Sequence, residues 1–291
     1  MMIREIEAKV MLAHVKQPDT WFGLKYNMNL YRGCQHQCIY CDSRSECYRI
    51  ENFSDVLVKV NAIDRLRDEL PRKRVKGTIG FGSMSDTYGL VEREYQLTRR
   101  ALEVIAEQGF PVHLITKSDL VARDVDVLQT INRVHAVVSF TITTADDALA
   151  RKVEPGAPSP SRRYRVMAAL AEAGIHVGVT LMPVLPFIED HVENVAAIVR
   201  LAHEHGAEYV LASFGMTLRD RQRAYYYDQL DRHFPGLRVQ YERRFGGRYG
   251  CGANGAAELE NLCGDLCAKY GLSQRVSRYE SGSPVRQLAL F

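Results

Sequence analysis

The chain has 291 residues, of which 46% are hydrophobic and 25% charged, a composition typical of a globular protein with one large α/β domain or two small ones. The net charge of +3 is too small to indicate nucleic-acid binding by itself, and no apolar stretch approaches the ~20 residues of a membrane span. The first residues lack the apolar core of a secretory signal, so we expect a cytoplasmic protein without a membrane partner.

Short β-rich runs alternate with longer amphipathic runs from residue 25 onward. The pattern predicts strands at residues 25–31, 77–81, 112–116, 136–143, 176–182 and 209–214. It predicts helices at residues 55–70, with Ser54 as N-cap, and at 92–108, 124–132, 160–173, 193–205 and 219–234. Continuous apolar strands indicate a parallel sheet buried on both faces, which right-handed crossovers curl into a partial (βα)6 barrel.

This alternation divides the chain into four parts. We expect an N-terminal segment over residues 1–24 and the α/β partial barrel over residues 25–235. A C-terminal extension follows over residues 236–272, with a helix at 256–270, and a flexible tail covers residues 273–291. In such folds the chemistry lies at the C-terminal ends of the strands, so polar residues at those ends are the site candidates.

Three of the seven cysteines, Cys34, Cys38 and Cys41, lie in one short loop after the first predicted strand. Cysteines packed so closely in a reducing compartment favour a metal site over disulfides. Three thiolates without an evident fourth ligand suggest a [4Fe–4S] cluster with one open iron. The alternatives are a zinc site completed by His36 or Cys47, and a structural trio of thiols.

The segment Tyr31-Arg-Gly-Cys34-Gln-His-Gln-Cys38-Ile-Tyr40-Cys41 resembles the signature of the radical S-adenosylmethionine (SAM) superfamily. Tyr-Arg-Gly before the first cysteine is similar to the spore photoproduct lyase-like branch. The resemblance covers about residues 25–235 and implies a SAM molecule that chelates the open iron. It further implies reductive cleavage of SAM to a 5′-deoxyadenosyl radical, which abstracts hydrogen from the substrate. That branch keeps a hydrogen-donor cysteine after the second strand, where this chain has Ser83 and Met84.

Polar residues at the ends of the predicted strands are the candidates for contact with SAM. The resemblance implies that Ser85 and Asp86 lie against the methionyl end of SAM. The alternative is that this stretch of small and polar residues only forms a tight turn. Lys117 suits the SAM carboxylate, and Thr141 suits the ribose, although threonine also favours strands for its shape alone. The segment from Glu154 to Arg163 resembles that of the branch, so we expect both residues at the SAM site, where Glu154 either contacts the ribose or holds Arg163.

The C-terminal part carries two further motifs. Cys251, Cys263 and Cys267 form a candidate auxiliary iron–sulfur cluster, with Cys47 as an alternative ligand, or they are buried free thiols. The final residues, Gln287-Leu-Ala-Leu-Phe291, are similar to the pentapeptide that docks bacterial repair proteins on the DNA polymerase sliding clamp. The alternative is that these residues fold back on the domain.

Three functions remain open at this point. The first is a radical SAM enzyme with a lyase or DNA-repair reaction, directed to DNA by the clamp peptide and by runs of basic residues. These runs are Arg72–Lys73–Arg74–Lys76, Arg219–Arg221–Arg223 and Arg243–Arg244–Arg248. The second is the same chemistry on a tRNA, a peptide or a metabolite. Both require an electron donor such as flavodoxin or ferredoxin. The third is a non-catalytic iron–sulfur electron carrier or sensor.

Overall fold

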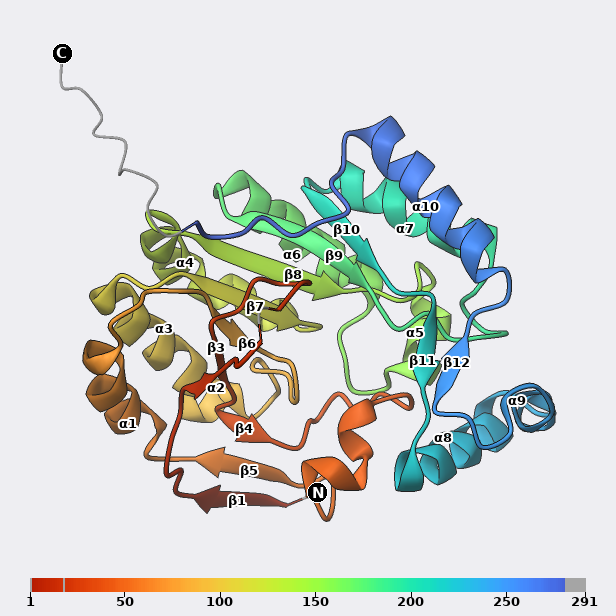
Figure 1. The fold of residues 1–291 in the computed structure, drawn as a ribbon, viewed down its shortest axis with the longest axis horizontal. Coiled ribbons are helices and arrows are strands. Elements are labelled where there is room, and N and C mark those ends of the chain that lie inside the picture. Colours follow the sequence, from red (N-terminus) through yellow and green to blue (C-terminus); the bar gives the residue numbers. More distant parts are fainter. Residues whose placement is uncertain (1, 18, 281–291) are drawn as a thin grey trace.

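The computed structural model describes residues 2–17 and 19–280, and its main element is a curved seven-stranded sheet (Figure 1). The strand order is β10-β9-β8-β7-β6-β3-β2, with every neighbouring pair parallel except β2 and β3. The strands are β2 (Ala13–His14), β3 (Tyr26–Met28), β6 (Ile79–Phe81), β7 (Val112–Thr116), β8 (Ala136–Thr141), β9 (His176–Leu181) and β10 (Tyr209–Ala212). The sheet ends at β10 and β2 without closing, so the expected α/β partial barrel is confirmed.

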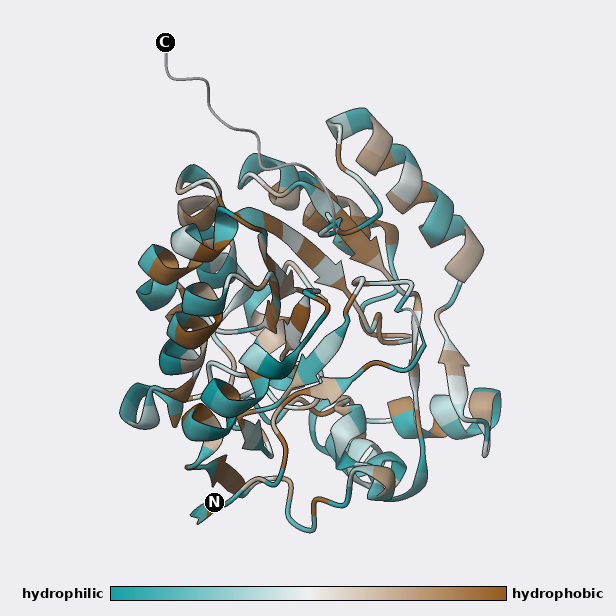
Figure 2. Ribbon diagram, turned by 60° about the vertical axis from the view of Figure 1, so that its left-hand side comes forward, coloured by the Kyte–Doolittle hydropathy of each residue, from teal (hydrophilic) through white to brown (hydrophobic). Residues whose placement is uncertain are grey.

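Helices cover the outer side of this sheet (Figure 1). They are α1 (Ala62–Glu69), α2 (Glu92–Tyr95), α3 (Leu97–Gln108), α4 (Val125–Asn132), α5 (Asp147–Val153), α6 (Pro160–Glu172), α7 (Val192–Glu204) and α10 (Ala256–Tyr270). Two further helices, α8 (Asp220–His233) and α9 (Leu237–Phe245), lie apart from this sheet (Figure 1). Figure 2 shows hydrophobic residues along the strands, while the helices carry hydrophilic residues on their outward faces. In the part of the chain that the structure describes, no helix is both long enough and apolar enough to span a membrane.

The predicted helix at residues 55–70 is wrong in its first half. Val56–Lys59 forms strand β5, which pairs with β1 (Ile3–Ile6) and β4 (Tyr31–Arg32) in a second, three-stranded sheet. Val56 and Val58 are buried and alternate with half-buried residues, which is the period of a strand. The helix α1 begins only at Ala62. Through β1 and β2, the N-terminal segment therefore contributes a strand to each of the two sheets.

The predicted helix at residues 92–108 is interrupted at Gln96, whose φ of 50° lies in the left-handed region. The Glu92 carboxylate accepts hydrogen bonds from the backbone N–H groups of Thr98 (3.0 Å) and Arg99 (3.4 Å), at the start of α3. This side chain therefore stabilises a second helix start within the segment. The short helices α5 and α9 were not expected from the sequence.

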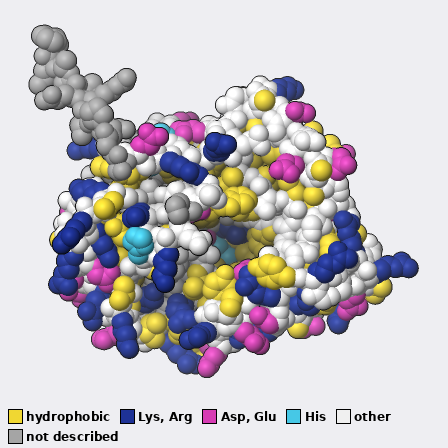
Figure 3. Space-filling model, in the orientation of Figure 1, with side chains coloured by type: hydrophobic (Ala, Val, Ile, Leu, Met, Phe, Trp, Pro, Cys, Tyr) yellow, Lys and Arg dark blue, Asp and Glu magenta, His cyan; other side chains and the backbone are white. Residues whose placement is uncertain are grey.

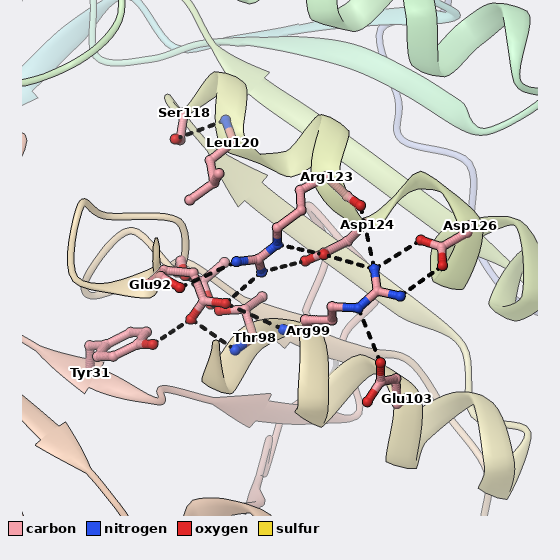
Figure 4. Close-up of polar contacts among 11 residues, drawn as sticks. Tyr31, Glu92, Thr98, Arg99, Glu103, Ser118, Leu120, Arg123, Asp124 and Asp126 are labelled. Carbon is pink, nitrogen blue, oxygen red and sulfur yellow. Dashed lines mark hydrogen bonds and ion pairs between the residues drawn. The ribbon is translucent and has the colours of Figure 1, made fainter. Parts of the chain in front are cut away.

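A buried polar network joins the start of the cysteine loop to three helices (Figure 4). Glu92, which has no exposed surface, accepts hydrogen bonds from the Tyr31 hydroxyl and from Arg123 (2.6 Å). Arg123 also binds Asp124 (2.8 Å), and Asp124 pairs with Arg99 (3.3 Å). Each buried carboxylate thus has cationic partners, which offset the cost of its desolvation. The network therefore holds the side chain of Tyr31, which lies three residues before Cys34 in the chain.

Candidate active site

A cavity of about 660 Å³ lies at the C-terminal ends of the barrel strands, within the size range of small-molecule sites. Figure 3 shows a hollow near the centre of the face that Figure 1 presents. Residues of the cysteine loop, of the ends of β6, β7 and β8, and of strands β11 (Gly215–Thr217) and β12 (Gly250–Gly252) line the cavity. The predicted site residues among them are Cys34, Cys38, Cys41, Ser85, Asp86, Lys117 and Thr141.

The three loop thiols face this cavity together; Cys38 is buried, and Cys34 and Cys41 are partly buried. Burial raises the pKa of Cys34 to about 12, and it also raises the pKa of Cys38 and Cys41 above the ordinary value. Thiolates at these positions therefore require compensating cations. Among the residues that the structure describes, no three His, Cys, Asp or Glu side chains converge on a single metal ion. A cuboidal cluster does not require such convergence, because each thiolate binds a different iron, so the three cysteines fit a [4Fe–4S] cluster.

Lys117 supplies a cation inside the cavity, directly after strand β7. Its ammonium nitrogen lies 4.0 Å from a carboxylate oxygen of Glu154 and 5.6 Å from the centroid of the Tyr40 ring. Burial lowers the pKa of Lys117, but the negative charges of the Cys38 thiolate, when that thiol is ionised, and of the Glu154 carboxylate outweigh burial and raise the pKa overall. The side chain therefore stays charged, as the binding of an anionic group requires.

Glu154 and Arg163 lie behind the cavity wall and form a buried ion pair of 2.5 Å. Arg163 also donates hydrogen bonds to the carbonyl oxygens of Thr141 and Pro158, both at 2.8 Å. The other Glu154 oxygen accepts a hydrogen bond from the Tyr40 hydroxyl. Neither Glu154 nor Arg163 lines the cavity. Glu154 thus holds Arg163, and the pair joins the end of β8 to the cysteine loop, whereas contact of either residue with SAM stays a prediction.

Hydrogen bonds of Asp86 and Ser85 connect the turn after β6 to the neighbouring segments. Asp86 accepts hydrogen bonds from the Thr116 hydroxyl (2.8 Å) and from the backbone N–H of Lys117 (2.7 Å), and its carboxylate lies 3.3 Å from the His36 ring. Burial raises the pKa of Asp86, but His36 and the backbone N–H donors hold the pKa below its usual range. The Ser85 hydroxyl donates to the carbonyl of Tyr31 (2.8 Å). Contact of these two residues with SAM stays a prediction.

Thr141 brings a hydroxyl to the cavity from the end of β8. Its oxygen lies 3.0 Å from the hydroxyl oxygen of Thr180 on β9, and both side chains are buried. The expected period-two placement of hydroxyl groups on β8 agrees with this position. The predicted ribose contact of Thr141 is not tested by the geometry.

The family model described as the radical SAM superfamily matches residues 28–199, which include the cysteine loop and the strands around the cavity. The chain belongs to the radical SAM superfamily. An uncharacterized protein of Mycobacterium tuberculosis is 31% identical over 229 residues, which cover 76% of this chain and 67% of that protein. A Pseudomonas phage M6 protein named radical SAM Nalpha-GlyT isomerase is 24% identical over 181 residues, covering 62% of this chain and 37% of that protein.

The solved structure of a spore photoproduct lyase complexed with dinucleoside spore photoproduct has a similar fold. Its TM-score is 0.71 at 15% sequence identity, and the similarity covers 93% of this chain and 80% of that one. This likeness confirms the radical SAM fold. Membership of the superfamily implies a [4Fe–4S] cluster and SAM, for which Cys34, Cys38 and Cys41 are the ligands that the chain offers.

The radical SAM cavity of this chain contains residues that the sequence did not predict. Cys251, on strand β12, lines the same cavity as the three loop cysteines. Trp21 comes from the loop after β2, and Phe214 comes from the loop after β10. Met182, after β9, also lines the cavity; the sequence marks it as part of an apolar segment that suits adenine packing or the core, and its contact with adenine stays a prediction. The pairing of β11 with β12 places Met216 opposite Cys251, 35 residues later in the chain. No local sequence pattern predicts this pairing.

The structure does not bring together the cysteines of the expected auxiliary cluster. Cys251 packs with Tyr40 and Met216, whereas Cys263 and Cys267 pack in the main core beneath α10. Cys47 is exposed, at the edge of the cysteine loop. The spacing of four residues does place Cys263 and Cys267 on one helix face, but that face packs against the protein core. Cys251, Cys263 and Cys267 are buried free thiols, which was the alternative to the auxiliary cluster.

The glycine before the first cysteine sets the geometry of the loop. Gly33 has a φ of +81°, and a Cβ atom there would lie 1.9 Å from the carbonyl oxygen of Asp55. Gly174 has the same φ of +81°, but a Cβ atom there would meet no atom within 4 Å. We expect Gly33→Ala to lower the free energy of unfolding by about 1–3 kcal/mol more than Gly174→Ala, because only Gly33→Ala adds overpacking to the strain. Chemical denaturation measures both, and equal losses would contradict the clash.

Glu189, after β9, is a buried carboxyl that the sequence did not single out. Burial and then nearby Glu154 raise its pKa from 4.5 to about 8, against hydrogen bonds from the Thr143 hydroxyl (2.7 Å) and the Leu185 N–H (3.0 Å). Between these pH values the folded state holds a proton that the unfolded state releases, so this group's contribution to stability falls as pH rises.

Glu189→Gln removes the ionisation and keeps the shape of the protonated carboxyl. We expect the free energy of unfolding of Glu189→Gln, relative to the unsubstituted protein, to increase steadily between pH 4.5 and about 8. Denaturation at a series of pH values measures this difference. Glu193→Gln, at an exposed position of α7, is the control and should give a flat difference. A flat difference for Glu189→Gln as well would show that Glu189 ionises normally.

Proposed function

We propose that the protein cleaves SAM reductively at a [4Fe–4S] cluster held by Cys34, Cys38 and Cys41, and abstracts hydrogen from a base in a nucleic acid. The observation that carries the proposal is that these three thiols and the Lys117 ammonium face one cavity at the ends of the barrel strands. When bound, the cluster supplies the electron that converts SAM into methionine and a 5′-deoxyadenosyl radical. Lys117 then binds and orients the SAM carboxylate, and Thr141 contacts the ribose.

The substrate class is supported by the relatives and by the charge of the surface. The phage relative is named for a Nalpha-GlyT isomerase, and a structure of similar fold binds a dinucleoside photoproduct. Residues 219–248 contain eight arginines and four acidic residues, a net charge of +4, whereas the whole chain carries +3. These residues lie between β11 and β12, both of which line the cavity. A phosphate backbone therefore has a basic surface directly beside the proposed site.

The structure joins two basic runs that are separate in the sequence. Arg223 on α8 donates hydrogen bonds to the backbone carbonyls of Gly246 (2.7 Å) and Arg248 (2.6 Å), at the end of α9. Arg221 likewise donates to the carbonyl of Arg44 (2.6 Å). Carbonyl oxygens carry no net charge, so these hydrogen bonds leave the positive charge of the arginines in place. Figure 3 shows dark blue side chains at the right, where Figure 1 places α8 and α9.

We expect the double variant Arg243→Gln/Arg248→Gln to bind single-stranded DNA more weakly and to reduce the slope of log K against log salt concentration by about 1 for each phosphate that the protein no longer neutralises. Both arginines are exposed. Fluorescence anisotropy of a labelled oligonucleotide at increasing salt concentration measures the slope. The control is Arg74→Gln, at an exposed position that follows α1 in the chain, a helix that Figure 1 shows on the side of the molecule opposite α9. Equal changes in both variants would argue against a specific role for the α8–α9 surface.

A hydrogen-transfer experiment tests the function. The reconstituted protein is incubated anaerobically with SAM, dithionite and a fully deuterated DNA oligonucleotide, either UV-irradiated or not. We expect deuterium in the 5′-deoxyadenosine, detected by mass spectrometry, because the radical takes its hydrogen from the substrate. Formation of 5′-deoxyadenosine without deuterium from either oligonucleotide would reject the DNA substrate while leaving SAM cleavage established.

The two protein partners of the enzyme are also proposals. Gln287-Leu-Ala-Leu-Phe291, the candidate sliding-clamp peptide, lies outside the described residues. A pull-down with sliding clamp, with and without these five residues, tests the docking. A flavodoxin or ferredoxin is proposed as the electron donor, and its replacement of dithionite in the assay is the corresponding test.

A further inference from the structure

Trp21, the single tryptophan of the chain, stands at the boundary of two cavities. It lines the cluster cavity together with Cys34, Cys38 and Cys41, and it also lines a neighbouring cavity of about 410 Å³. Its side chain is 43% exposed, which is unusual for the largest apolar residue in a chain with an extensive core. Open space therefore borders the indole on the side of each cavity.

The backbone around Trp21 is held in place by its neighbours. The Asp19 carboxylate accepts hydrogen bonds from the backbone N–H groups of Trp21 (2.9 Å) and Phe22 (3.0 Å). The Phe22 ring packs edge-to-face against His113, with centroids 5.0 Å apart. Arg278 donates a hydrogen bond to the carbonyl of Thr20. An aromatic side chain on a fixed backbone loses little conformational entropy when a ligand packs against it.

The rest of the cavity wall leaves room for a flat group. Gly250 and Gly252 of β12 present bare backbone, and a Cβ atom at either position would meet no atom within 4 Å. Met182, Phe214 and Met216 add apolar surface. The cationic side chains lie elsewhere: Lys117 belongs to the end of the cavity that holds the thiols, and the arginines of residues 219–248 do not line it. The carboxylate of Asp42 also lines the cavity and accepts a hydrogen bond from the Thr217 hydroxyl of β11 (3.0 Å).

We propose that the Trp21 indole is the platform on which the substrate base stacks in the cluster cavity. This inference rests on the proposed function, because it takes the substrate to be a nucleic acid. A polyanion bound along residues 219–248 brings its bases to a cavity whose wall offers an accessible indole. Every base has a π-face that can stack on an aromatic ring, so the platform contributes affinity without selecting one base. Selection of the reacting base then depends on the remaining cavity wall.

The fluorescence of Trp21 tests the stacking directly, since no other tryptophan contributes. The reconstituted protein with SAM is titrated with a single-stranded DNA oligonucleotide of mixed sequence, and with an abasic oligonucleotide of equal length and charge. We expect the first to quench the fluorescence and the second to leave it unchanged. Equal quenching by both, or no quenching by a base-containing oligonucleotide that binds, would overturn the inference.

Two variants provide an independent measurement by anisotropy of the labelled oligonucleotide. We expect Trp21→Leu to weaken binding of the base-containing oligonucleotide roughly 5- to 150-fold, the effect of losing one stacked base, and Trp21→Phe to restore most of it. Val239→Ala, at an exposed apolar position of α9, is the control and should bind normally. Unchanged binding by Trp21→Leu would reject the platform but not the DNA substrate, whereas absence of binding by the unsubstituted protein would reject both. The fluorescence titration needs no variant, so misfolding of Trp21→Leu would not prevent the test.

Discussion

Cys38→Ala is expected to abolish cluster binding and, with it, the production of 5′-deoxyadenosine from SAM. Cys38 is buried and lines the cavity with Cys34 and Cys41, so its removal leaves two thiols where a site-differentiated [4Fe–4S] cluster uses three. Iron content and visible absorbance after anaerobic reconstitution measure the first effect, and chromatography of the products measures the second.

The matched control for Cys38→Ala is Cys267→Ala. Cys267 is equally a buried free cysteine, but it packs in the main core beneath α10 and does not line the cavity. This variant should keep the full iron content, whatever small stability it loses. An equal loss of iron in both variants would mean that the loop cysteines have no special role. Retention of a SAM-cleaving cluster by Cys38→Ala would contradict the ligand assignment.

Arg163→Met is expected to lower the free energy of unfolding by about 3–5 kcal/mol. Arg163 has no exposed surface, and it binds Glu154 and the carbonyls of Thr141 and Pro158. Its replacement by a side chain of similar length leaves the Glu154 carboxylate buried with only Lys117, at 4.0 Å, as a cationic partner. An uncompensated buried charge is among the most costly changes in a protein core. Chemical denaturation measures the loss.

The neighbouring arginine is the control for this prediction. Arg162 lies on the same helix, its side chain is 53% exposed, and it pairs with Asp119. An exposed ion pair contributes about 0–1 kcal/mol, so Arg162→Met should change the stability little. Similar losses for the two variants would show that burial of the Glu154–Arg163 pair has no special effect.

Most strands and helices of the barrel could be predicted because their hydrophobic period is local. The strand at residues 112–116 and the helix at residues 256–270 occur where the pattern placed them. The helix predicted at residues 55–70 was partly wrong, because β5 pairs with β4 and with β1, the latter more than 50 residues earlier in the chain. The break at Gln96 depends on a side chain, Glu92, that caps the second helix. Such tertiary interactions leave no periodic signal.

In the candidate site too, residues in local motifs could be predicted, whereas residues placed by tertiary contacts could not. The cysteine loop is a local motif, and the ends of parallel strands meet at one edge of a sheet, so Lys117 and Thr141 could be placed in advance. Trp21 and Cys251 reach the cavity through loop anchoring and through the pairing of β11 with β12, which the sequence does not reveal. The sequence also located the segment of Glu154 and Arg163, but their ion pair behind the cavity wall became visible only in the structure.

The most direct test of the central claim is a single-turnover measurement of SAM cleavage. The reconstituted protein is reduced with dithionite, mixed with SAM, and its methionine and 5′-deoxyadenosine are quantified against the cluster content. We expect both products in equal amounts in the presence of DNA, and neither from Cys38→Ala. A cluster that is reduced without forming 5′-deoxyadenosine would contradict the proposed enzyme and favour an iron–sulfur electron carrier.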